Sequence, residues 1–134
     1  MKRVTGLGGV FFKTDGKEQL LDWYRKRLGI EAADYGFAFL WNERDRPDET
    51  GYTVWSPFAR DSDYFAPSGH DTMLNFRVAD LAALLEALKT EGVEQVGEMK
   101  QEANGKFAWV LDPDGRKIEL WEPVPSAEDP YLPK

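Results

Sequence analysis

Residues 107–123 read FAWVLDPDGRKIELWEP, which predicts two short strands joined by a tight turn. In DPDG, Pro113 fixes its own φ angle and Gly115 takes the left-handed conformation that such a turn requires. A turn of this type with a glycine bulge sets the strand register, so that Trp109 lies opposite Glu119. Because alternate residues of a strand point to opposite faces, Glu119 is predicted to share its face with aromatic side chains.

A similar pattern occurs earlier in the chain, and we interpret the two occurrences as copies of one unit. FAFLW at 37–41 matches FAWVL at 107–111, YTVWSPF at 52–58 matches IELWEPV at 118–124, and the strand-and-helix segment at 8–31 matches the one at 73–95. Chance accounts for one resemblance between aromatic strands more easily than for several elements that agree in order. The sequence therefore favours a duplicated half.

Helix boundaries are marked in both halves. Asp15 with Glu18 forms a capping-box-like pair before an apolar stripe that ends at Gly29. Asp80 is the expected N-cap of the second helix, which Gly92 ends.

These elements predict an α+β fold. Two βαβββ half-domains are expected to form a curved, mostly antiparallel sheet around a cavity, with the helices outside. The second strand of the first half is weak, around 31–34, and its counterpart is expected around 93–98. The single domain, 1–134, is divided into a first half at 4–56, a connector at 57–71, a second half at 72–123 and a surface tail at 124–134.

Composition excludes several functional classes. The chain of 134 residues has no cysteine, which excludes disulfides, zinc–thiolate sites and thiol catalysis. A net charge of −7 and the lack of a basic patch argue against nucleic-acid binding. No apolar run is long enough to span a membrane, and MKRVTGLGG does not resemble a signal peptide, so we expect a cytoplasmic protein.

The paired halves, together with DWYRKRLGIE and DPDGRKIELWEP, resemble the vicinal oxygen chelate superfamily. This group includes glyoxalase I, bleomycin-resistance proteins, fosfomycin-resistance enzymes and extradiol dioxygenases. The resemblance spans residues 4–123 and implies a cavity enclosed by the sheet, a small-molecule ligand and a homodimer. In the metal enzymes of the family, His, Gln or Glu side chains on the first and last strands of each half bind a divalent ion.

Strand alternation predicts which side chains line that cavity. The expected ligand-binding residues are Phe11, Phe39, Trp41, Trp55, Met73, Asn75, Arg77, Phe107, Trp109 and Trp121. Aromatic walls with a few polar groups are typical of small-molecule sites. The alternative is that these aromatic side chains simply fill the core of the sheet.

The family's four ligand positions correspond to Gly9, Thr53, Met73 and Glu119. One carboxylate does not hold zinc, nickel or manganese, so neither a metal site nor any other cofactor is expected. A divalent metal held in an unusual way is the alternative. His70, the single histidine, is either a solvated loop residue or a group at the cavity mouth.

These observations leave three functions open, and whether the protein is an enzyme is undecided. The first is a glyoxalase- or bleomycin-resistance-like protein that binds a small molecule and performs no chemistry. The second is a glyoxalase-like lyase or isomerase with Glu119 as the catalytic base, with or without a divalent metal. The third is a dimerisation module whose core is filled.

Overall fold

The structure, a computed structural model, describes residues 3–133. In chain order the elements are β1 (Val4–Thr14), α1 (Lys17–Leu28), β2 (Phe37–Asn42), β3 (Thr50–Ala59), β4 (Thr72–Val78), α2 (Leu81–Thr90), β5 (Lys100–Glu102), β6 (Gly105–Leu111), β7 (Lys117–Pro123) and the 3₁₀-helix η1 (Ser126–Glu128). No helix within residues 3–133 is long and apolar enough to cross a membrane.

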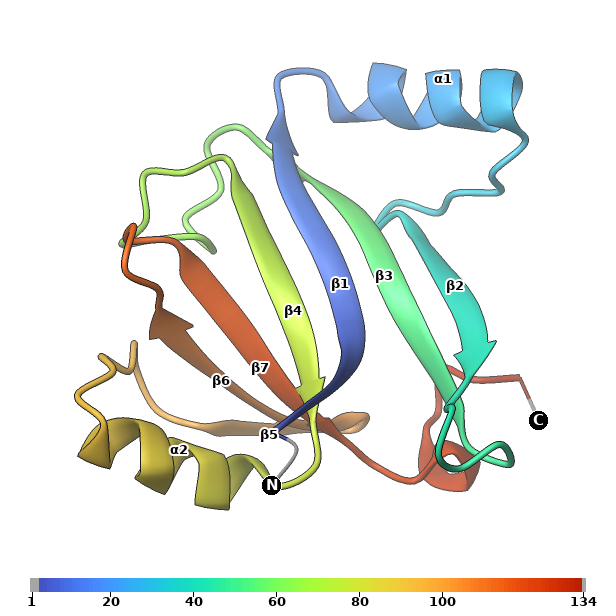
Figure 1. Cartoon of the computed structure of the whole chain (residues 1–134). Coiled ribbons are helices and arrows are strands. Elements are labelled where there is room, and N and C mark those ends of the chain that lie inside the picture. Colours follow the sequence, from blue (N-terminus) through green and yellow to red (C-terminus); the bar gives the residue numbers. More distant parts are fainter. Residues whose placement is uncertain (1–2, 134) are drawn as a thin grey trace.

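The strands form a seven-stranded sheet in the order β2-β3-β1-β4-β7-β6-β5. The β1–β3 and β4–β7 pairs are parallel, whereas the β1–β4, β2–β3, β5–β6 and β6–β7 pairs are antiparallel. Figure 1 shows β1 and β4 side by side in the middle of the sheet, with α1 near β3 and β2, and α2 near β6. The predicted α+β class is therefore confirmed.

The expected strand that follows each helix differs from the prediction. Residues 31–34 form no strand, and Ala33 makes an isolated bridge to Gly36, whose φ of 119° turns the chain immediately. At 93–98 the chain pairs with β6 only through an isolated bridge between Gln95 and Val110, and the regular strand β5 begins after Gly97, whose φ of 71° interrupts the extended backbone. The segment before the connector therefore contributes three strands to the sheet, and the segment after it contributes four.

The two helix starts have different outcomes. Asp80 is the N-cap of α2, as predicted, because its carboxylate accepts a hydrogen bond at 3.1 Å from the backbone N–H three residues later. The predicted cap of α1 is wrong, since Gly16 occupies the N-cap position. Asp15 instead accepts a hydrogen bond at 2.9 Å from the Arg60 guanidinium at the end of β3.

The two faces of the sheet hold different side chains. On the helix face, Leu81 and Leu84 of α2 are buried against β6 and β7. The opposite face carries Glu119 and is named the Glu119 face. There, Phe65 of the connector is completely buried. It lies in a cluster with Phe11, Met73 and Trp109.

The C-terminal residues correct one expectation. Asp129 is 1% exposed and accepts a hydrogen bond at 2.8 Å from the Tyr52 hydroxyl. Leu132 is 7% exposed and packs against Tyr52 and Trp121 on the Glu119 face. The prediction of a surface tail at 124–134 is therefore wrong for these two residues, because aromatic side chains of the sheet offer an apolar place that Leu132 fills. Residue 134 lies outside the described residues.

Candidate functional site

Glu119 is the polar centre of its face. It is 3% exposed, in the middle of β7. The β6–β7 register places Trp109 opposite it, and the β4–β7 register places Asn75 beside it. Its carboxylate accepts hydrogen bonds from Trp109 Nε1 at 2.9 Å, from Asn75 Nδ2 at 2.5 Å and from the Tyr64 hydroxyl. Neighbouring strands and the connector thus supply three donors to one carboxylate.

Lys117 lies next to this network. Its Nζ donates a hydrogen bond at 2.7 Å to the Tyr64 carbonyl and lies 5.3 Å from the Tyr64 ring centre and 5.5 Å from the Trp109 ring centre. Burial lowers the pKa of Lys117, and the negative charge of Glu119 opposes that shift. The pKa of Tyr64 is raised, chiefly by burial and then by the charge of Glu119. Tyr64 therefore stays a protonated donor at neutral pH.

A pocket of about 290 Å³ opens beside Glu119, and Tyr64, Trp109 and Lys100 help to line it. Tyr64 is 37% exposed and comes from the connector, whereas Asn75 and Trp109 are held within the sheet. Tyr64 is thus the donor that can leave without disturbing a strand. Glu119 thus lies buried at the wall of this pocket and is bonded there to Tyr64.

A second and larger pocket of about 520 Å³ lies on the same face, between the edge strand β2 and the C-terminal residues. Its lining is mostly apolar or aromatic: Tyr35, Phe37, Ala38, Leu40, Tyr52, Val54, Asn104, Tyr131, Leu132 and Pro133. Its volume and composition are typical of sites for small organic molecules.

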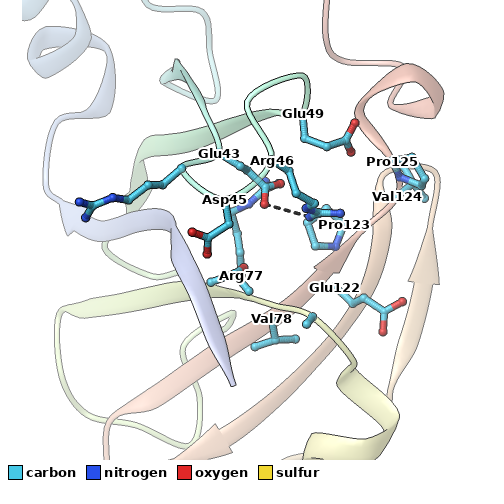
Figure 2. A pocket seen from close by; sticks show the side chains of 13 residues that line it. Glu43, Asp45, Arg46, Glu49, Arg77, Val78, Glu122, Pro123, Val124 and Pro125 are labelled. Atoms are coloured by element: carbon cyan, nitrogen blue, oxygen red, sulfur yellow. Dashed lines mark hydrogen bonds and ion pairs between the residues drawn. The ribbon is translucent and has the colours of Figure 1, made fainter. Parts of the chain in front are cut away.

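A third pocket of about 540 Å³ lies where the β2–β3 loop meets the end of β4 (Figure 2). Among its charged groups, Arg46 forms an ion pair with Glu43 at 2.9 Å, and the Glu49 carboxylate accepts hydrogen bonds from Ser126. Arg77 is 3% exposed, and its guanidinium lies 4.7 Å from the Trp121 ring centre and 5.2 Å from that of Trp41. Burial lowers the pKa of Arg77. Its guanidinium also lies 3.7 Å from the Glu43 carboxylate, so Arg77 joins the aromatic cluster to the β2–β3 loop.

Most of the predicted site residues contact one another, but they form four separate groups and not one site. Asn75 and Trp109 contact Glu119; Phe107 stacks on Trp121 with ring centres 5.6 Å apart; Phe11 and Met73 pack around Phe65; Trp41 and Arg77 lie together near the third pocket. Phe39 and Trp55 lie elsewhere.

The orientation predicted for the first hairpin is wrong. Trp55 packs against Tyr24 of α1, with ring centres 4.5 Å apart, so it points to the helix face. Val54, expected on the helix face, packs instead with the cluster on the Glu119 face. Phe37 pairs with Trp55, and Phe39 lies two residues further along the same strand. Phe39 therefore points to the same side as Trp55, where it is 45% exposed. A shift by an odd number of residues in the alignment of the two halves reverses every side chain of a strand.

The four positions that the sequence alignment matched to the family's metal ligands have other roles here. Gly9 has no side chain, and Met73 is 1% exposed within the apolar cluster. The Thr53 hydroxyl donates a hydrogen bond at 2.7 Å to the Leu7 carbonyl. Within residues 3–133, no group of three or more His, Cys, Asp or Glu side chains is placed to hold a metal ion. The side chains at these positions, with Glu119 as the single carboxylate, do not fit the ligand set that the resemblance implies.

His70 lies beside the DPDG turn. Its Nε2 is 3.0 Å from the carbonyl oxygen of Asp114, and its backbone N–H donates a hydrogen bond at 3.0 Å to the Ser68 hydroxyl. The contact with Asp114 joins the connector to the β6–β7 turn. A role in holding the connector in place therefore accounts for its position.

Three residues of the site were not predicted from the sequence: Tyr64, Tyr52 and Leu132. Tyr64 and Leu132 come from the connector and the C-terminal residues, where no strand or helix periodicity places a side chain. Tyr52 lies two residues before Val54 on the same face, so it was missed together with Val54 when the predicted alignment reversed the faces of β3.

Comparisons with known proteins agree with this fold. A family model described as Glyoxalase/Bleomycin resistance protein/Dioxygenase superfamily matches residues 14–120. Methylmalonyl-CoA epimerase from Mycobacterium tuberculosis is similar in structure, with a TM-score of 0.62 and 25% identity over 92% of this chain and 91% of that chain. No curated protein matches the chain significantly.

Two further solved structures share the fold at lower identity. A variant of Streptomyces coelicolor methylmalonyl-CoA epimerase, in complex with 2-nitronate-propionyl-CoA, has a TM-score of 0.65 and 15% identity over 90% of this chain and 99% of that chain. A structure named NAD-dependent benzaldehyde dehydrogenase, from Legionella pneumophila, has a TM-score of 0.53 and 14% identity over 87% of this chain and 98% of that chain. With the family match over most of its length, the chain belongs to the Glyoxalase/Bleomycin resistance protein/Dioxygenase superfamily.

Proposed function

We propose that the protein binds a small, mainly apolar organic molecule on the Glu119 face, without a divalent metal at the family's ligand positions. The pocket of about 520 Å³ beside β2 carries this proposal, because its walls are apolar or aromatic and its polar groups are few. In this respect the protein resembles the bleomycin-resistance type, which holds a ligand without converting it.

The bonding of Glu119 supports the metal-free part of the proposal. A carboxylate that already accepts hydrogen bonds from Asn75, Trp109 and Tyr64 would lose them on binding an ion.

We further propose that the two halves are copies of one unit. The pairing of Phe11 with Ser56 then corresponds to that of Asn75 with Glu119, so Ser56 rather than Thr53 is the counterpart of Glu119.

Titration with the fluorescent probe anilinonaphthalene sulfonate (ANS) tests the proposal. Leu40 and Phe39 are neighbours on the edge strand, 53% and 45% exposed, but only Leu40 lines the pocket. Leu40→Ser should weaken ANS binding by about tenfold, since burial of a leucine side chain contributes roughly 1.5–3 kcal/mol. Phe39→Ser should leave the affinity unchanged. Equal effects of the two substitutions, or no saturable binding, would refute the proposal.

Proton transfer is the second candidate function. Glu119 and Lys117 are buried ionisable side chains that both contact Tyr64, and the similar epimerase structures favour an isomerase-like reaction. Glu119 would remove a proton next to a carbonyl after Tyr64 turns away. The test is exchange of the substrate hydrogen of methylmalonyl-CoA in deuterium oxide. Exchange that is lost in Glu119→Gln would support catalysis, and absence of exchange would exclude this substrate.

A further inference from the structure

We infer that the C-terminal residues 126–133, named the C-terminal strap, set the size of ligand that the Glu119 face accepts. The inference rests on the proposed function, because it concerns the same pockets. Figure 1 shows the chain leaving β7 and passing the lower ends of β3 and β2, where the C-terminus lies. The strap thus returns across the sheet to the first half.

The strap separates the two pockets of this face. Tyr131 and Asn104 line both the pocket beside β2 and the pocket beside Glu119. Leu132 lines the first of these and is buried against Tyr52 and Trp121. With the strap in place, each pocket holds a compact ligand. With the strap released, the two spaces become one groove that accepts an elongated aromatic ligand.

Side chains hold the strap at two points. At its start, the Ser126 backbone N–H and hydroxyl donate hydrogen bonds to the Glu49 carboxylate at 3.1 and 2.9 Å. Further along, Asp129 accepts the hydrogen bond of the buried Tyr52 hydroxyl at 2.8 Å. Both partners belong to the β2–β3 region, so the strap connects the end of the second half to the first.

The strap can open without breaking the sheet. Its backbone hydrogen bonds beyond η1 are local, such as those of the Tyr131 N–H to the Asp129 carboxylate at 2.9 Å and of the Leu132 N–H to the Asp129 carbonyl at 3.4 Å. Tyr131 is 69% exposed. Within the described residues the strap is held by side-chain contacts, including those of Leu132 and Asp129, and not by strand pairing, so it opens at a lower free energy than the sheet that it covers.

The test compares ANS with bis-ANS, its covalent dimer, which has the same chemistry at about twice the size. Leu132→Ala weakens the strap, so the fraction of open molecules rises and bis-ANS should bind at least about tenfold more tightly. ANS affinity should fall, because Leu132 lines the compact pocket that ANS occupies, so the two probes should respond in opposite directions. The matched control is Leu28→Ala, at a 57% exposed leucine at the end of α1. It should leave both affinities unchanged.

A second measurement does not depend on ligand binding. Hydrogen exchange followed by mass spectrometry should show the strap exchanging faster than β7 in the wild type, and faster still in Leu132→Ala. If the wild type binds ANS but Leu132→Ala leaves bis-ANS affinity unchanged, the inference is wrong and the proposed function stands. If ANS does not bind while strap exchange responds as expected, the proposed function fails and the strap is a structural lock only. Strap exchange as slow as that of β7 in both proteins overturns the inference independently.

Discussion

The Tyr64 hydroxyl donates a hydrogen bond to the Glu119 carboxylate, so a residue of the connector completes the polar centre of the sheet. The same tyrosine stacks on Phe58 of β3, with ring centres 5.6 Å apart and planes inclined by 15°. It therefore joins β3 of the first half to β7 of the second. The chemistry available to Glu119 depends on whether this tyrosine stays in place.

Tyr64→Phe removes the hydroxyl and keeps the ring. The Glu119 carboxylate then lacks one donor, so the free energy of unfolding should fall by about 1 kcal/mol, the lower end of the range for an unsatisfied buried group, since Tyr64 is partly exposed. Urea denaturation measures this loss. The control, Tyr35→Phe, removes a hydroxyl from a tyrosine that is 52% exposed and should be neutral. Equal stability of both variants would show that the Tyr64–Glu119 bond contributes nothing.

Gly8→Ala should disturb the donor on the other side of Glu119. A Cβ at this position would lie 2.1 Å from Asn75 Oδ1 and 2.9 Å from Trp121, which is 2% exposed. Overpacking of this kind costs about 1–3 kcal/mol of stability. At Gly69 nothing lies within 4 Å of an added Cβ, so Gly69→Ala should have little effect. A stable Gly8→Ala variant would contradict the close packing of Asn75.

Trp55→Ala tests the corrected orientation of β3. Because Trp55 packs against α1, its loss should destabilise the protein by about 2–4 kcal/mol and leave ANS affinity unchanged. Trp23→Ala, at a tryptophan that is 51% exposed, should cost less than about 1 kcal/mol. A Trp55→Ala variant that keeps its stability but loses ANS binding would place Trp55 on the ligand side.

The buried Tyr52 predicts a loss of stability at alkaline pH. Burial, then the hydrogen bond to Asp129 and the charge of that carboxylate, raises the pKa of Tyr52, and the hydrogen bond from Asn104 opposes this shift only in part. The unfolded chain releases this proton near pH 10 while the folded chain keeps it, so stability falls as pH rises above about 10. Tyr52→Phe should show a smaller fall between about pH 8 and about pH 11 in urea denaturation. The lowered pKa of Lys117 has the opposite effect on stability at alkaline pH, but the effect is the same in the wild type and in Tyr52→Phe. An identical loss of stability in the two proteins would therefore contradict the role given to Tyr52.

The second hairpin could be predicted from the sequence because its turn fixes its register. The DPDG turn places Trp109 opposite Glu119 and Phe107 opposite Trp121, as the structure confirms. The first hairpin has a longer polar loop, at 43–49, which leaves the register open. Alignment with the second half then placed Thr53 where the pairing places Ser56, and this shift of three residues, an odd number, put Trp55 on the wrong face.

Contacts from outside the regular elements could not be predicted in the same way. Tyr64 reaches Glu119 across 55 positions of sequence, and Tyr52 reaches Asp129 across 77. No local periodicity encodes such contacts, because they depend on how the completed sheet curves. The sequence therefore identified Glu119 as the polar centre but not the tyrosine that covers it, nor the C-terminal strap.

Mapping of bound ANS by amide NMR spectra, in the presence of EDTA, tests the central claim most directly. The account predicts saturable changes at Ala38, Leu40 and Val54, which line the apolar pocket, with little change in α1. Binding that EDTA abolishes, or changes confined to α1 or to the loop at 43–49, would contradict a metal-free ligand site on the Glu119 face.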